Sequence, residues 1–97
     1  MADDDDSGFI PIIEAAKRGN DGMIEDCVSE GEDPKKLDTQ GNSALHWAAA
    51  GNHVDCINLL VKMGVDINLR NKDGETPLHK AAWKDHAAAA KALVRFF

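Results

Sequence analysis

Apolar side chains recur along the chain at the spacing of an α-helix, and the same pattern returns at a regular interval. Leu45, Ala48 and Ala49 lie three and four positions apart, on one face of a short helix, and a second set at Ile57 and Leu60 marks a second helix. The apolar pattern therefore predicts two helices in each unit. The matching positions are Ile12, Ala15, Ala16 and Leu78, Ala81, Ala82 for the first helix, and Ile24, Cys27, Val28 and Ala90, Leu93, Val94 for the second.

A shift of the sequence that places Gly41 on Gly74 tests this repeat directly. Residues 38–64 and 71–97 then align without any insertion and are identical at eight positions. Chance at average composition would give roughly two identities. The alignment therefore predicts one repeat domain over residues 5–97, with units at 5–37, 38–70 and a shortened 71–97, preceded by an acidic disordered leader at residues 1–4.

Residues at the ends of the predicted helices indicate how the helices are connected. Thr76 followed by Pro77 is a favourable helix start, because the hydroxyl can cap a free N–H and proline at the first position loses no hydrogen bond. Gly51 and Asn52 accept the left-handed backbone of a tight reversal. After Gly64 we expect an extended stretch at residues 65–68 and a turn at residues 71–74. The expected fold is an all-α solenoid of antiparallel helix pairs joined by hairpin-like turns.

Two segments carry a family resemblance. GETPLHKAA at residues 74–82 resembles the G-x-T-P-L-H-x-A-A signature of the ankyrin repeat, and LLVKMGVDIN at residues 59–68 resembles its L-L-x-x-x-G-A-D-V-N tail. The resemblance implies an ankyrin-repeat solenoid, but the family shares a scaffold and not a chemistry. It also implies structural rather than catalytic roles at the turns and helix starts for Gly41, His46, Gly74, Thr76 and His79.

The two terminal units depart from the family pattern. In the first unit, Ile12 and Ile13 replace the Leu-His step, and Ile10 stands at the cap position. In the last unit, alanines occupy residues 87–90, which lowers the apolar area at a free end. Phe96 and Phe97 follow without a terminating glycine. Either these rings cap the last unit, or the natural protein continues with further repeats.

Composition and charge restrict the function. The 97 residues are 43% hydrophobic, with no apolar run long enough to span a bilayer and no signal-peptide pattern after Met1. We therefore expect a monomer in the cytoplasm, and also in the nucleus. The net charge of −6 comes from residues 1–37, which have 11 acidic and 4 basic side chains. Without a dense Lys/Arg cluster, neither nucleic acid nor membrane is an expected partner.

The sequence offers little support for catalysis or metal binding. It has no G-x-S-x-G motif, no P-loop and no dinucleotide-binding turn, so we expect no enzyme activity and no cofactor. Cys27 and Cys56 fall on or beside apolar helix positions, where a thiol is inert. The histidine pairs are duplicated with the repeat and lack converging carboxylate or thiolate ligands, so no metal site is expected.

The strongest functional expectation concerns protein binding. The resemblance implies that partners contact the hairpin tips and the exposed face of each first helix, the concave surface of such solenoids. An alternative for Trp47 is that it packs partly in the core. The surface is mildly basic, which fits a partner segment with acidic and apolar residues. The expected binding residues are Arg18, Gln40, Asn42, Trp47, Arg70, Lys72, Lys80, Trp83 and Lys84.

Asn68 is a candidate modification site. Leu60 lies eight residues before it and Asp66-Ile67 directly precede it, which resembles the acceptor pattern for asparaginyl hydroxylation in animal ankyrin proteins. We favour the alternative that Asn68 stabilises the turn. An intact mass without a species 16 Da heavier would exclude the modification.

These expectations converge on a non-catalytic interaction module that serves as an adaptor, scaffold or inhibitor. Two alternatives remain open at this point. The first alternative is a regulatory or targeting domain of a longer enzyme or channel, which the shortened third unit suggests. The second is an engineered repeat protein without a selected partner.

Overall fold

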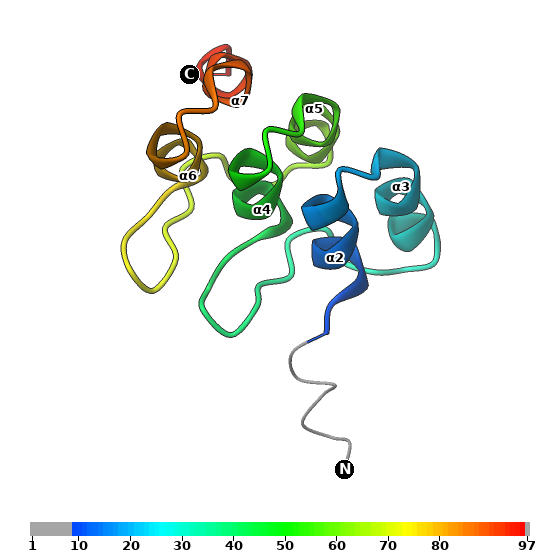
Figure 1. Cartoon of the computed structure of the whole chain (residues 1–97). Coiled ribbons are helices and arrows are strands. Elements are labelled where there is room, and N and C mark those ends of the chain that lie inside the picture. The colour runs from blue at the N-terminus through cyan, green and yellow to red at the C-terminus, as the bar shows by residue number, and fades with distance from the viewer. Residues whose placement is uncertain (1–8, 97) are drawn as a thin grey trace.

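The computed structural model describes residues 9–96, and this part of the chain forms six α-helices (Figure 1). The acidic leader predicted at residues 1–4 and the ring of Phe97 lie outside the described residues. The helices are α2 (Pro11–Arg18), α3 (Asp21–Ser29), α4 (Ala44–Ala50), α5 (Val54–Lys62), α6 (Pro77–Trp83) and α7 (Ala87–Val94).

The helices form three antiparallel pairs that stack side by side (Figure 1). Helices α2, α4 and α6 make one row, in which α4 packs between the other two. Helices α3, α5 and α7 make the second row, and long loops connect each pair to the next on one side of the stack. The predicted all-α solenoid is confirmed.

Each pair reverses direction at one left-handed residue. Gly19, Asn52 and Asp85 have φ of +71°, +62° and +59° and occupy equivalent positions in the three units. Glycine, asparagine and aspartate tolerate this conformation better than most residues. The prediction of a left-handed reversal is therefore confirmed for Asn52, but Gly51 keeps a right-handed φ of −97°.

Side-chain caps define the starts of the first helices. Ser43 and Thr76 each accept the amide of the histidine three residues later, His46 and His79, and each histidine side chain accepts the cap residue's own amide. These capping boxes satisfy backbone N–H groups that the helix leaves free. Helix α2 has only Ile10 at this position, and the amide of Ile12 instead donates to Glu32 Oε2 at 3.1 Å. A carboxylate from the loop after α3 thus caps α2.

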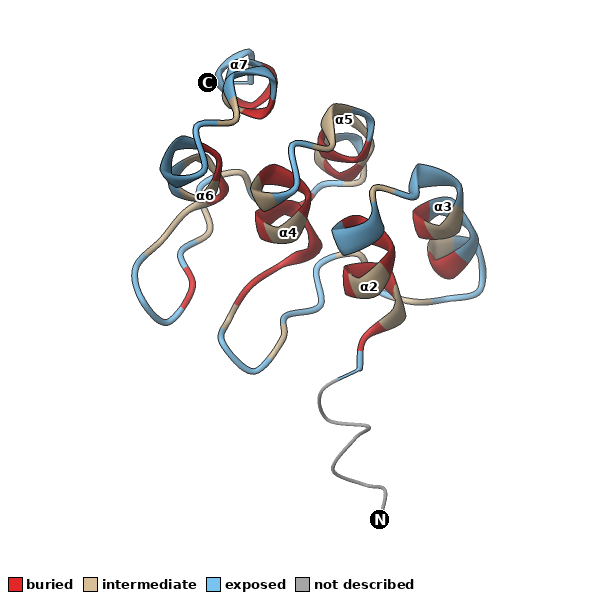
Figure 2. Cartoon of the chain, viewed as in Figure 1, coloured by how far each residue is buried: buried red, intermediate tan, exposed pale blue. Residues whose placement is uncertain are grey.

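Burial differs between the middle and last units because of their neighbours. Leu45 and Ala49 on α4 are fully buried, because α6 packs over them (Figure 2). The equivalent residues of α6, Leu78 and Ala82, are half-buried and exposed, respectively. Phe96 is also exposed, so its ring does not bury this face. The apolar pattern predicted for α6 is present, but its outer positions are less buried than those of α4.

The connection after α5 is a turn rather than the extended stretch predicted at residues 65–68. Gly64 has a left-handed φ of +94° after the helix, and Val65 is buried. The Asp66 carboxylate then accepts the amide of Asn68 at 2.9 Å, and this local hydrogen bond bends the chain. Asn68 is exposed at this turn.

Candidate functional site

The exposed side of α2, α4 and α6 and the two loops that precede α4 and α6 form one continuous surface, which we call the inner-helix surface. Hydrogen bonds close both loops as hairpins: Asp38 pairs with Asn42, and Asn71 with Glu75, each through an amide-to-carbonyl bond of 2.9 Å. Gly41 takes a left-handed φ of +80°, and a Cβ there would lie 3.1 Å from the Lys72 amide. The second hairpin therefore packs directly on the first.

Two hydrogen bonds join the hairpins. The Asn71 side chain donates to Asn42 Oδ1 at 2.8 Å, and the Lys72 amide donates to the Gln40 carbonyl at 2.9 Å. Asn42 is consequently only 4% exposed, and its side chain is not available to a partner. Our expectation that Asn42 is a binding residue is wrong, because its amide group is used to stack the hairpins. Gln40 remains exposed beside it.

Trp47 lies half-buried on α4 and packs against the core, so it is not the freely exposed residue expected on this surface. Its indole N–H donates to Asp38 Oδ2 at 2.9 Å. The Lys17 ammonium lies 4.4 Å from the ring centroid, within the range of a cation–π contact. The alternative of partial core packing therefore describes Trp47 better, although one side of the residue still lines a surface cavity.

Asp38 connects the first hairpin to Trp47, a role that the sequence reasoning missed. Its carboxylate accepts the amides of Gln40 at 3.0 Å and Asn42 at 2.8 Å, in addition to the indole. Burial acts to raise the pKa of this carboxyl, but these hydrogen bonds outweigh burial and hold the pKa below the ordinary value of 3.8. The sequence does contain a sign of this role, because Asp38 and Asn71 occupy equivalent positions, each three residues before a turn glycine.

We expect Asp38→Asn to lower the free energy of unfolding by about 2 kcal/mol at pH 7, because an amide NH₂ cannot accept the indole hydrogen bond. The folded pKa of Asp38 is depressed, so its contribution is present above the unfolded pKa and is lost as pH falls through the folded value. Urea titrations at pH 7 and pH 3 measure the effect.

The difference between Asp38→Asn and the natural chain should shrink at pH 3. Asp66→Asn is a matched control, since Asp66 is exposed and accepts one local amide. An equal loss in both variants at pH 7 would contradict a special role for Asp38.

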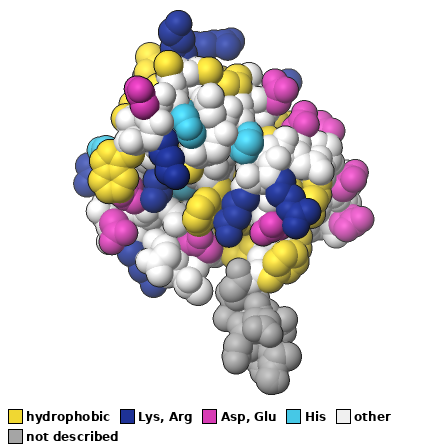
Figure 3. Space-filling model, viewed as in Figure 1, with side chains coloured by type: hydrophobic (Ala, Val, Ile, Leu, Met, Phe, Trp, Pro, Cys, Tyr) yellow, Lys and Arg dark blue, Asp and Glu magenta, His cyan; other side chains and the backbone are white. Residues whose placement is uncertain are grey.

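The remaining expected binding residues fall into two groups. Trp83 is 77% exposed at the end of α6, and Lys84, Lys72 and Arg70 are also exposed. Arg18 and Lys80 are instead engaged within the chain, by Glu14 and Glu75, each at 2.9 Å. Hydrogen bonds from Asn71 and Lys80 to Glu75 lower the pKa of that carboxyl. Figure 3 shows one face of the molecule, on which Lys and Arg atoms lie on either side of hydrophobic surface.

His46 and His79 have different surroundings despite their equivalent positions. His46 is fully buried; its Nδ1 accepts the Ser43 amide at 3.1 Å, and its Nε2 donates to the Glu75 carbonyl at 2.8 Å. Burial, followed by the nearby Lys80, lowers the pKa of the His46 ring. His79 makes the same local cap but is exposed. His46 therefore links two units, whereas His79 caps only its own helix in the described structure.

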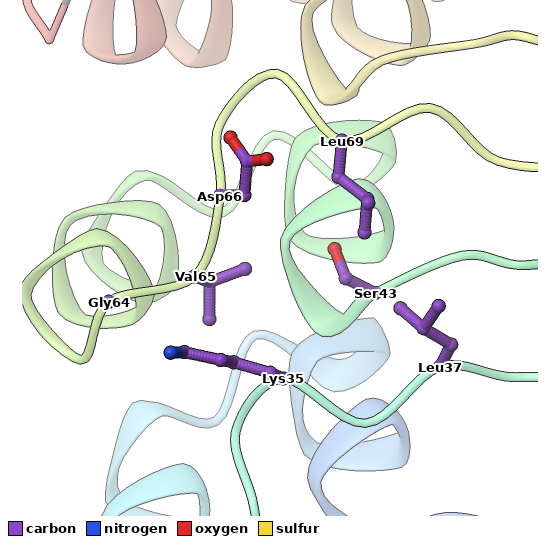
Figure 4. Close-up of a pocket in the computed structure, with 7 residues that line it drawn as sticks. All are labelled: Lys35, Leu37, Ser43, Gly64, Val65, Asp66 and Leu69. Carbon is purple, nitrogen blue, oxygen red and sulfur yellow. The ribbon is translucent and has the colours of Figure 1, made fainter.

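A second cavity lies between the loops that follow α3 and α5, beside Ser43 at the start of α4 (Figure 4). Its volume is about 230 Å³, and the side chains of Leu37 and Leu69 point into it from opposite loops. Lys35 extends along its edge toward Gly64. Residues that line it are Lys35, Leu37, Ser43, Gly64, Val65, Asp66 and Leu69, a set with no nucleophile–base pair.

Within residues 9–96, no three His, Cys, Asp or Glu side chains come together in a group that could hold a metal ion. No helix in the described part of the chain is long and apolar enough to cross a membrane. The two cysteines are buried and unpaired in this part of the molecule. Burial raises the pKa of the Cys56 thiol to about 11, so the thiol stays protonated at neutral pH.

Known proteins share this repeat sequence. A family model described as ankyrin repeats (3 copies) matches residues 12–96. Neurogenic locus notch homolog protein 1 of Danio rerio is 44% identical over 71 residues, which cover 73% of this chain, and the Homo sapiens protein is 43% identical over 74 residues, 76% of the chain.

An inactive serine/threonine-protein kinase, TEX14 of Mus musculus, is 40% identical over 79 residues, 81% of the chain. The matched region makes up only 3% of the notch proteins and 5% of the kinase. The three helix pairs, their capping boxes and the family match agree: the chain belongs to the ankyrin repeat family and forms an ankyrin repeat domain, a protein-interaction module.

Proposed function

We propose that this domain binds another protein through the inner-helix surface and has no catalytic activity of its own, as in an adaptor, scaffold or inhibitor. The observation that carries the proposal is Trp83, which is 77% exposed beside the exposed Lys84. Tryptophan is among the side chains that most often dominate binding energy at protein interfaces. The proposed partner carries acidic and apolar residues, because the exposed indole of Trp83 is followed directly by the exposed cation of Lys84.

The non-catalytic part of the proposal is supported by the surroundings of the reactive groups. The thiols of Cys27 and Cys56 are buried, and the pKa of each is raised, first of all by burial. Both ring nitrogens of His46 are engaged in structural hydrogen bonds. These groups are therefore poorly suited to act as a nucleophile and its base.

A second candidate function is the regulation or targeting of a longer protein that contains such a domain. The observation in its favour is that this chain matches only 3–5% of the length of its relatives, one of which is an inactive kinase. In that case the partner surface would act on another domain or on a recruited protein. The inner-helix surface would be used in both functions.

An affinity pull-down from native cells, using matched variants, tests the proposal. Trp83→Ala/Lys84→Glu changes the inner-helix surface, whereas Val94→Ala/Lys91→Glu makes comparable changes at exposed positions of α7. The first variant should weaken binding of a recovered partner by about tenfold or more, since truncation of an interface tryptophan often costs over 1 kcal/mol. The second should bind normally. Equal retention by both variants would overturn the proposal.

A further inference from the structure

A surface cavity of about 240 Å³ lies at the ends of three helices on the inner-helix surface. Lys17 reaches it from the last turn of α2, Trp47 from α4, and Lys84 from the end of α6. Ala50 and Gly51 complete the lining, and both are small. Two lysines and a tryptophan thus line the same space.

The lysines of this cavity differ from the other cations on the surface in their pairing. Arg18 and Lys80 have carboxylate partners at 2.9 Å. Within residues 9–96, Lys17 and Lys84 form no ion pair with a carboxylate. Lys17 lies over the Trp47 ring, a contact that leaves its ammonium N–H groups free to donate to an incoming acceptor.

The indole of Trp47 is held in place. Its N–H donates to Asp38, whose carboxylate also accepts two amides of its own hairpin. Asp38 therefore faces its own donors, and no carboxylate of the described residues lines the cavity. A site that is already rigid loses little conformational entropy when a ligand binds.

We propose that this cavity receives a carboxylate side chain, Asp or Glu, of an acidic partner segment, between Lys17 and Lys84, while an adjacent apolar side chain packs on the exposed ring of Trp83. This inference rests on the proposed function and specifies the chemistry of its partner. Charge complementarity favours this occupant, because within residues 9–96 neither Lys17 nor Lys84 has a carboxylate partner. Reversible contact is sufficient, and no covalent step is involved.

Selection from a library of random dodecapeptides displayed on phage tests the inference without knowledge of the natural partner. Peptides enriched by the full chain should contain Asp or Glu next to an apolar residue. Their dissociation constants are then measured by fluorescence anisotropy. Lys17→Gln or Lys84→Gln should each weaken binding up to about fivefold, and the double variant by about tenfold or more. Binding should also weaken as the salt concentration rises.

Lys62→Gln and Lys91→Gln are the matched controls, because both lysines are exposed on the second row of helices, and they should leave binding unchanged. The aspartates at residues 3–6 could compete for the cavity, so the selection is repeated with a chain that lacks residues 1–7. Capture of acidic peptides by the shortened chain alone would still support the site, provided that Lys17→Gln/Lys84→Gln abolishes it.

Enriched peptides without acidic residues, or peptides that bind Lys17→Gln/Lys84→Gln as tightly as the natural chain, would overturn the inference. Failure of both chains to select any peptide would also overturn it. If non-acidic peptides are enriched and bind Trp83→Ala more weakly than the natural chain, the inner-helix surface remains the binding surface. Only the carboxylate site is then rejected. If the proposed function itself were wrong, Trp83→Ala/Lys84→Glu would instead bind a recovered partner as tightly as the natural chain does.

Discussion

A chain that lacks residues 71–97 is expected to be unfolded at 25 °C. This deletion removes α6 and α7 and uncovers Leu45, His46 and Ala49, which are fully buried in the intact stack. It also removes the carbonyl of Glu75 that His46 contacts and the Asn71 side chain that holds Asn42. A folded domain of this length has a free energy of unfolding of only about 5–15 kcal/mol.

The two remaining units would be too few to bury a continuous core, since stacked repeats need about three units to be stable. Circular dichroism at 222 nm, followed from 5 to 80 °C, measures the effect. We expect a weak helical signal and no sigmoidal transition. A cooperative melt of the shortened chain would mean that each unit is more independent than the packing of α4 between α2 and α6 suggests.

The second large effect is expected for His46→Ala, which should lower the free energy of unfolding by about 3 kcal/mol. The substitution empties a fully buried site and leaves the Ser43 amide and the Glu75 carbonyl without their partner. His79→Ala is the matched control, because His79 makes the same cap but is exposed. His79→Ala should lower the free energy of unfolding by about 1 kcal/mol or less.

The pH dependence distinguishes the two histidines further. The His46 pKa is lowered in the folded state, so the unfolded chain binds a proton more readily than the folded chain. Stability contributed by neutral His46 is present above the unfolded pKa of about 6.5 and is lost as pH falls below it. Urea titrations from pH 8 to pH 5 should show this loss in the natural chain and in His79→Ala, but less of it in His46→Ala. Equal destabilisation by both substitutions at pH 8 would contradict the account.

The periodic features of the fold could be predicted from the sequence because they depend on local chemistry that is repeated from unit to unit. Thr76 and Ser43 cap their helices, and Asn52 takes the left-handed reversal, since each needs only neighbours within a few positions. Burial could not be predicted in the same way. Leu45 and Leu78 are identical residues at equivalent positions, but within residues 9–96 a further helix pair covers only Leu45.

The errors in the candidate site have the same physical origin. Its position at a hairpin predicts Asn42 on the binding surface, yet Asn42 is buried because Asn71 of the next hairpin donates to it. Trp47 is expected on the same surface, but Asp38 and Lys17 hold it against the molecule. The Asn42–Asn71 and Lys17–Trp47 contacts join neighbouring units, and a single-unit alignment contains no information about such pairs. Asp38 lies only nine residues before Trp47, in the same unit.

The central claim is that the inner-helix surface, rather than the second row of helices, binds the partner. Its most direct test is the ratio of dissociation constants for one recovered partner measured with Trp83→Ala/Lys84→Glu and with Val94→Ala/Lys91→Glu. Both variants should melt close to the natural chain, because all four residues are exposed. We predict a ratio of about ten or more. A ratio near one, or weaker binding by the α7 variant, would contradict the claim.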